Sequence, residues 1–235
     1  MSLKKWILGG AAFLVLLAAA FLFIKSSPPP PIKLPNPNGY DDLVQAGQMF
    51  VGELPECDWT PSLDDECLEE TKTFLKANSE VLKRVRLGLS RESRLPTEFT
   101  QVYISNHLPE LAVIKRLALT LAAEGKVAEK ENRMDDAIQS YLDAARLNGQ
   151  MRGSVMIDAL VGIAVEAIGV NPLQKLSNGM TREQRQEVIK ALTQVYTNRD
   201  SFEEVLKNEK KLRSQNSRNS RPVCLSYHLF FTTGS

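Results

Sequence analysis

The stretch "EGKVAEKENRMDDAIQSYLDAARLNG", residues 124–149, decides the fold. Small residues stand on both sides of a predicted turn: Gly125 and Ala128 precede it, and Ala144 follows it. Residues of this size let two antiparallel helices approach closely, and Tyr141 is large enough to fill the groove between them. The stretch therefore predicts a helical hairpin.

The same residues resemble one tetratricopeptide repeat, a helix–turn–helix unit of about 34 residues. The sequence departs from the pattern at Glu124, where an apolar residue is usual, and at Gly149, where a proline is usual. No second or third copy follows at this spacing. Because such arrays need at least about three units to bury a continuous core, we expect a single repeat-like hairpin inside a compact bundle. The interaction surface that this resemblance implies consists of Asn132, Asp135, Asp136 and Tyr141.

Apolar residues three and four apart recur through most of the chain, and no stretch alternates with a period of two. This pattern predicts an all-α fold with about six helices and essentially no sheet. The first helix is expected within 40–54, opened by aspartates, and a longer one reaches from a cap at Ser62 to Leu89. A third begins near Pro109. Later helices are expected over 181–196, where Thr181 and Gln184 form a capping box, and over 199–213.

The segment "SVMIDALVGIAVEAIG", residues 154–169, is apolar nearly all round, as is typical of a helix in a bundle core or in a membrane. It is short for a span, and Asp158 and Glu166 would each cost about 2.5–3.5 kcal/mol near the middle of a bilayer. We therefore predict the central core helix. Its glycines permit close packing, and Asn171-Pro172 is expected to end it.

Asp158 and Glu166 are eight residues apart and fall on one side of this helix. Two buried carboxylates could act as acid and base or bind a metal ion. Alternatively, they form a polar stripe paired with Arg146, Arg152 or another base. Because no Glu-x-x-His motif is present, the pattern favours the stripe, and we predict no cofactor and no catalytic residue.

Residues 6–24, "WILGGAAFLVLLAAAFLFI", carry no charge. As a helix they would be about 28 Å long, close to the roughly 30 Å hydrocarbon core of a bilayer. Lys4 and Lys5 precede them, and the positive-inside rule places the amino terminus in the cytoplasm. Cleavage after Ala18–Ala20 is the alternative, but it would leave four large apolar residues at a new amino terminus. We therefore predict a transmembrane anchor at 1–25.

The sequence divides further at changes in composition. Residues 26–39 are rich in proline and favour an extended spacer of about 3.1 Å per residue. Residues 40–212 form the predicted helical bundle. Residues 213–235, "RSQNSRNSRPVCLSYHLFFTTGS", change composition abruptly, so we expect a tail that is disordered or an aberrant end, from truncation or a shifted reading frame.

Lysine and arginine number 29 and aspartate and glutamate 28, so the chain has no overall basic character and we expect no nucleic-acid partner. Basic residues do gather near the carboxyl end, as a solvated tail or as a contact for an anionic surface. They are Lys207, Lys210, Lys211, Arg213, Arg218 and Arg221.

Three cysteines are present: Cys57, Cys67 and Cys224. In an oxidising compartment Cys57 and Cys67 can form a disulfide, and two unpaired thiols are the equal alternative. A metal site is not expected, because neither His107 nor His228 lies near a cysteine pair.

The stretches "PNGYDDLVQAG" (37–47), "IDALVGIAVEAIG" (157–169) and "FEEVLKNE" (202–209), together with the hairpin, resemble a group of uncharacterised, amino-terminally anchored helical proteins of planctomycete-type bacteria. The resemblance covers about residues 1–210. It implies a single-pass protein of the bacterial inner membrane with a periplasmic carboxyl-terminal domain, and it carries no activity.

Three classes of function follow. The first is an anchored, exported scaffold or adaptor that binds a protein partner in the envelope, with no small-molecule ligand. The second is a structural envelope component without a specific partner. The third is an enzyme that uses Asp158 and Glu166, for which the sequence offers no nucleophile elbow, phosphate loop or metal motif. The tether, the spacer and the hairpin favour the adaptor.

Overall fold

In a computed structural model of the whole chain, the structure describes residues 33–56, 65–100 and 102–219. These residues contain helices and no strand, which confirms the all-α prediction for this part of the chain. The described residues from Leu34 to Asn219 belong to one compact unit. The predicted anchor at 1–25 lies outside the described residues. The helices are α2 (Gly39–Gln48), α3 (Asp65–Ala77), α4 (Ser79–Leu89), α5 (Tyr103–Lys130), α6 (Met134–Arg146), the 3-10 helix η1 (Leu147–Gln150), α7 (Met156–Leu176), α8 (Arg182–Asn198) and α9 (Phe202–Asn219).

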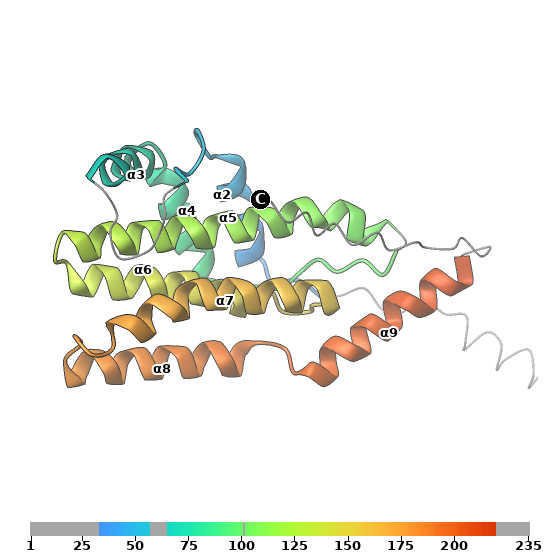
Figure 1. Cartoon of the computed structure of the whole chain (residues 1–235). Helices are drawn as coiled ribbons and strands as arrows, with labels where there is room; N and C mark the ends of the chain where they lie inside the picture. Colours follow the sequence, from blue (N-terminus) through green and yellow to red (C-terminus); the bar gives the residue numbers. More distant parts are fainter. Residues whose placement is uncertain (1–32, 57–64, 101, 220–235) are drawn as a thin grey trace, which may run out of the picture. The chain divides into compact units, whose positions relative to one another are not determined.

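The helices pack around the long helix α5 (Figure 1). The antiparallel partner of α5 is α6, and α7 returns along α6 while also contacting α5. On its other side α5 is covered by α2 and α3, α4 packs against α2, and α8 packs against α6. The last helix, α9, contacts the beginning of α7.

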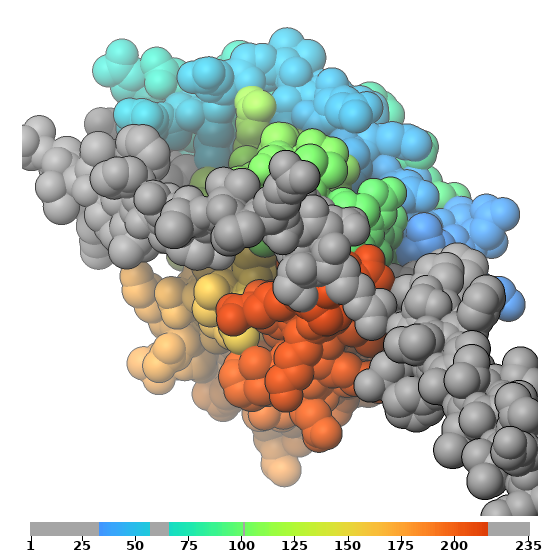
Figure 2. Space-filling view, turned by 90° about the vertical axis from the view of Figure 1, so that its right-hand side faces the viewer, coloured from blue at the N-terminus to red at the C-terminus, as the bar shows by residue number. Residues whose placement is uncertain are grey.

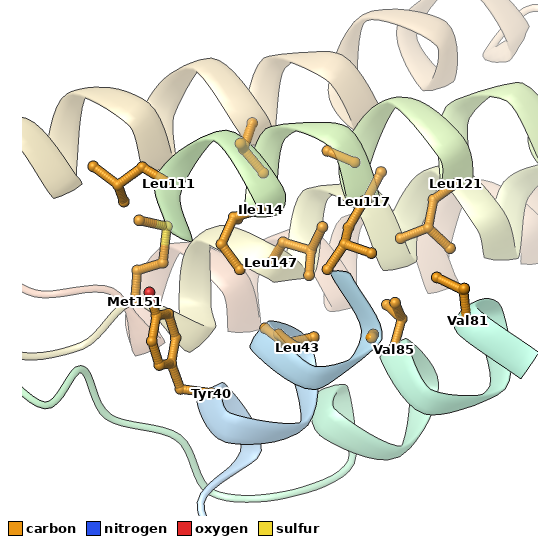
Figure 3. Packing of buried hydrophobic residues seen from close by; sticks show 14 of the residues in the cluster. Tyr40, Leu43, Val81, Val85, Leu111, Ile114, Leu117, Leu121, Leu147 and Met151 are labelled. Carbon is orange, nitrogen blue, oxygen red and sulfur yellow. The ribbon is translucent and has the colours of Figure 1, made fainter. Parts of the chain in front are cut away.

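The largest apolar cluster lies between α5 and the two short helices α2 and α4 (Figure 3). Ile114, Leu117 and Leu121 on one face of α5 are almost completely buried. Leu43 from α2 and Val85 from α4 point toward them. Fully burying a side chain of this size contributes about 1.5–3 kcal/mol, so the burial of three of them on one face of α5 stabilises the bundle strongly. The central helix is therefore α5.

The prediction that 154–169 is the central core helix is wrong. Only one narrow stripe of α7 is buried: Asp158, Gly162, Val165, Gly169 and Leu173. Leu160 and Ile163 on the opposite face are each 56% exposed. Among the described residues α7 is the one helix that is long and apolar enough to cross a membrane by length and composition. An all-round apolar sequence gives no preferred face, so periodicity could not show that one side would remain open.

The expected single helix from Ser62 to Leu89 is two helices, and Ser62 lies outside the described residues. The break falls at Asn78, which is 1% exposed. Its side-chain amide donates to the carbonyls of Val51 and Phe74, each at 2.9 Å, and its Oδ1 accepts from the amide of Val51 at 2.9 Å. Asparagine side chains that bond the backbone compete with helix continuation, and here the competition ends α3.

Two predicted boundaries set by proline are also wrong. Helix α5 begins at Tyr103 rather than near Pro109, and α7 continues through Pro172 to Leu176. A proline removes one helical hydrogen bond, but tertiary packing compensates in both places. Tyr103 is 6% exposed beside Leu212 of α9, and the turn after Pro172 buries Leu173 at 3% exposure.

Other boundaries follow the sequence signals more closely. Thr181 and Gln184 form the predicted capping box at the start of α8, with bonds of 2.8 and 3.2 Å. The cap of α2 is Asn38, not an aspartate, and its Oδ1 accepts from the amide of Tyr40 at 3.4 Å. Helix α9 extends to Asn219, past the helix end expected at residue 213.

Candidate functional site

The α5–α6 hairpin is held together by a glycine beneath an aromatic ring. A Cβ atom added at Gly125 would lie 2.6 Å from the ring of Tyr141, a distance that real Cβ atoms do not reach. Asn132 in the connecting turn has a φ of 60°, a left-handed conformation that asparagine tolerates better than most residues. A third helix approaches as closely, because a Cβ at Gly169 of α7 would lie 2.3 Å from the carbonyl oxygen of Tyr141. Tyr141 is therefore fixed between three helices.

A groove of about 250 Å³ lies above Tyr141, between α5 and α7. Leu119 and Ala122 line it from α5, and Ile168 and Pro172 line it from α7. These four side chains make its walls apolar. Grooves with apolar walls and a few polar groups are the usual form of a binding site for a ligand or a peptide side chain.

The polar groups of the groove are arranged at its rim. The Tyr141 hydroxyl donates to Glu129, and Lys126 Nζ lies 3.1 Å from Glu129 Oε2. Burial, followed by the adjacent Glu129, raises the pKa of Tyr141, so its hydroxyl remains protonated and a donor. Lys175 lies exposed on the α7 side. The rim thus presents two ammonium groups beside an apolar interior, and one of them is already paired.

The four residues predicted as an interaction surface separate into two places. Asn132, Asp135 and Asp136 are exposed at the tip of the hairpin, whereas Tyr141 is buried at the base of the groove. Asp135 Oδ1 accepts from Gln184 of α8 at 2.6 Å, and Asp136 is paired with Arg133. The aspartates therefore connect surface elements, and the groove is the feature with the geometry of a binding site.

Glu124, which departs from the repeat pattern, has a structural explanation. Its carboxylate accepts from Arg86 of α4 and from the hydroxyl of Ser140 at 2.8 Å. Arg86 also bonds Asp143 of α6, with 3.1 Å between Nε and Oδ2. An apolar residue at position 124 would leave Arg86 with Asp143 as its one partner in this network. The network fastens α4 to the hairpin.

A second polar cluster is buried where α2, α5 and the first turn of α7 meet. His107 is 4% exposed and lies between two carboxylates, with Nδ1 at 2.8 Å from Glu110 Oε2 and Nε2 at 3.1 Å from Asp158 Oδ1. The second contact is within ion-pair distance, and among the described residues neither Nε2 nor Asp158 Oδ1 has a hydrogen-bond partner. Tyr40 donates to Glu110 Oε2 at 2.9 Å, and the ring of Tyr103 stacks on His107 at 5.0 Å. We call these five residues the His107 cluster.

The charges of the His107 cluster depend on each other. Burial by itself lowers the pKa of His107, but Asp158 and Glu110 together outweigh it, so the pKa lies above its usual value. Burial, and after it the neighbouring carboxylates, raises the pKa of Tyr40 and of Tyr103. Asp158 Oδ2 also accepts from the amide of Val155 at 2.8 Å, which caps α7. The cluster therefore connects three helices and fixes the start of α7.

Asp158 and Glu166 are not brought together as an acid and base pair. Asp158 faces His107, whereas Glu166 accepts from Asn148 at 2.5 Å and lies 3.6 Å from Arg199. The described residues contain no group of three or more His, Cys, Asp or Glu side chains that could hold a metal ion. The arrangement matches the polar stripe paired with bases, and the bases are His107 and Arg199 rather than Arg146 and Arg152.

His107 was not predicted from the sequence as a partner of Asp158. The local signal was present in "YISNHLPE", where Tyr103, His107 and Glu110 stand four and three residues apart and so share one helix face. The contact to Asp158 crosses 51 positions of the sequence, and no local pattern could show it.

Of the cysteines, Cys67 is disulfide-bonded at the start of α3. Cys57 and Cys224 lie outside the described residues, so the pairing of Cys57 with Cys67 stays a prediction.

Comparison with known proteins adds no relative: no protein-family model matches the chain, and neither a curated protein nor a solved structure is significantly similar to it.

Proposed function

We propose that this chain is a membrane-anchored helical adaptor of a bacterial envelope, and that the groove between α5 and α7 binds an apolar segment of a protein partner. The observation that carries the proposal is the groove itself. Its walls are Leu119, Ala122, Ile168 and Pro172, and its base is the fixed ring of Tyr141. Burying one large apolar side chain of a partner there would contribute about 1.5–3 kcal/mol, enough to anchor a short segment.

The rim supports a partner segment that also carries a carboxylate. Lys126 already has Glu129 as a partner, whereas Lys175 has no ion pair among the described residues. An acidic side chain next to the apolar anchor could reach Lys175 without displacing an existing contact. Charge complementarity at a rim contributes mainly to specificity and to the rate of association.

The membrane anchor supports the setting of the proposal. The uncharged residues 6–24 and the proline-rich residues 26–39 precede the described helices, as expected of a domain held at a distance from a bilayer. In the bacterial inner membrane, with the amino terminus in the cytoplasm, the domain and its groove would face the periplasm.

The test is co-purification of the full chain from detergent-solubilised membranes, with mass spectrometry of the bound proteins. Asn171 is exposed at the groove, so Asn171→Trp fills the groove without disturbing the core. Gln186 is exposed on α8 outside the groove, and Gln186→Trp is the matched control. We expect the same partner with the unmodified chain and the control, and its loss with Asn171→Trp. Recovery of no reproducible partner, or of the same proteins with all three chains, would contradict the proposal and favour a purely structural component.

A further inference from the structure

We infer that the outer face of α9 is a membrane-contacting surface that binds anionic lipid headgroups. The inference rests on the proposed membrane tether for its geometry, and on the charges of α9 for its chemistry. We call Lys207, Lys210 and Lys211 the lysine stripe.

The lysine stripe is a continuous cationic surface. Lys210 and Lys211 follow Lys207 by three and four positions, so the three residues lie on one side of the helix, and all three are exposed. They also line a shallow depression with Leu206 and the acidic residue Glu203. Among the described residues no carboxylate lies within ion-pair distance of any of the three, whereas the neighbouring Arg213 is paired with Glu209 at 3.1 Å. Lys211 Nζ also lies 5.6 Å from the centroid of the Phe99 ring, so within the described part of the chain Lys207 and Lys210 are the lysines of the stripe without such a contact and are open to an external anion.

Within the described helix α9, the acidic residues form no ion pair with the stripe, although Glu203 lines the same depression. Glu203 and Glu204 are in the first turn, where the helix dipole favours negative charge. Glu209 is engaged with Arg213 and with the amide of Met156 at 3.2 Å. The helix is therefore acidic at its start and basic over the turns that follow.

The exposed aromatic ring of α9 lies away from the stripe. Phe202, at the first position of α9, is 68% exposed and lines a pocket with Ala159 and Ile163 of α7, not the depression of the lysines. The choice of a lipid surface over a soluble anionic partner therefore rests on the proposed tether and on where the stripe lies relative to the start of α2.

The stripe lies at the end of the domain where the spacer arrives. Gly39, at the start of α2, is hydrogen-bonded at 2.9 Å to the segment 92–95, and that segment is bonded at 2.7 Å to 152–154. Asn208 of α9 donates to 152–154 at 3.1 Å. A space-filling view from this side shows α9 in red on the surface, with the first described residues in blue on the same side (Figure 2). A domain tethered through α2 would thus present α9 toward the bilayer.

The groove lies at the opposite end of α5. Tyr103 packs against Leu212 of α9, and Lys126 is at the groove rim. At about 1.5 Å per residue these two positions are roughly 35 Å apart along the axis of α5. Membrane contact through α9 would therefore leave the groove open to a partner.

The experiment is acetylation of lysines in the full chain reconstituted in nanodiscs, with rates measured by mass spectrometry. One lipid is phosphatidylcholine alone, and the other contains phosphatidylglycerol. Each lysine near an anionic surface gains about fivefold in binding, so the stripe should be acetylated about fivefold more slowly with phosphatidylglycerol. High salt should remove the protection. Exposed Lys115 and Lys190, away from α9, should react equally in both lipids.

A pair of variants separates lipid binding from local structure. Lys207→Glu with Lys210→Glu should abolish the protection of Lys211, whereas Lys115→Glu with Lys190→Glu should preserve it. Equal acetylation of the stripe in both lipids, or protection that survives high salt, would overturn the inference. Failure of the chain to stay in phosphatidylcholine nanodiscs would instead refute the tether. In that case the chain could still bind phosphatidylglycerol nanodiscs and not phosphatidylcholine nanodiscs, with the stripe protected from acetylation, and this would support the α9 surface. Binding of the chain to neither kind of nanodisc would overturn the inference.

Discussion

Gly169→Ala tests the close packing that positions Tyr141. The added Cβ would lie 2.3 Å from the carbonyl oxygen of Tyr141, 2.6 Å from the amide nitrogen of Ala145 and 3.0 Å from the Cβ of Ala145. The two nearest atoms belong to the backbone of α6, so no side chain can rotate out of the way. The substitution therefore forces α6 and α7 apart.

The magnitude follows from two opposing effects. Overpacking a well-packed interface costs about 1–3 kcal/mol, and an obstacle made of backbone belongs at the upper end of that range. Alanine is favoured over glycine inside a helix by about 1 kcal/mol. We expect a net destabilisation of about 2 kcal/mol, which lowers the Tm of a domain of this size by about 4–8 °C.

The assay is thermal unfolding followed by circular dichroism, and Gly149→Ala is the matched control. At Gly149 the added Cβ meets nothing closer than the Cβ of Asn198 at 3.9 Å, so its Tm should stay the same or rise. A Tm for Gly169→Ala equal to that of the control would refute the close approach of α7 to Tyr141, and with it the rigid base of the groove.

Three further predictions concern individual polar contacts. The pKa of His107 is raised in the folded chain, so its stabilising effect is fully present below the pKa of about 6.5 in the unfolded chain and is lost as pH rises through the folded pKa. The Tm should therefore fall between pH 6 and alkaline pH, and His107→Gln should flatten this dependence. An unchanged slope of Tm against pH in His107→Gln would contradict the ion pairs. Asn78→Ala removes three hydrogen bonds and leaves the backbone N–H and C=O of Val51 without their partners, so urea unfolding should show that the free energy of unfolding falls by about 2–4 kcal/mol. A fall of less than about 1 kcal/mol would show that the break after α3 does not depend on this side chain. Thr181→Ala removes the cap of α8 and should cost about 1 kcal/mol in the same assay, with Thr181→Ser, which keeps the hydroxyl, as the control.

Local signals predicted the parts of the fold that depend on neighbouring residues. The capping box at Thr181 and Gln184 is an interaction over three positions, and the structure contains it. The pairing of Gly125 with Tyr141 joins residues on two consecutive helices, and the spacing of small residues around the turn was enough to predict close contact.

Contacts between distant residues could not be predicted in this way. The Asn78 side chain ends α3 by bonding Val51, 27 positions earlier, and nothing in the sequence around Asn78 marks that partner. Asp158 was singled out as a buried carboxylate, but its pairing with His107 depends on how α7 lies against α5. The exposed face of α7 is a further case, because the apolar residues that surround this helix do not indicate which of them will meet α6.

The groove itself could not be predicted from the sequence either. Its walls come from α5 and α7 and its base from α6, so its existence depends on the relative positions of three helices. Tyr141 was correctly singled out as the residue that fills the space between the helices of the hairpin. The apolar walls above it became evident only from the packing of α7.

Photo-crosslinking in intact cells tests the central claim most directly. A photoreactive amino acid at Ala122, on the α5 wall of the groove, is compared with the same amino acid at Gln186 on α8. The adaptor account predicts one dominant crosslinked protein from position 122 that is absent at position 186 and that is lost when Asn171→Trp fills the groove. No adduct from position 122, or an adduct that persists in the filled groove, would contradict it.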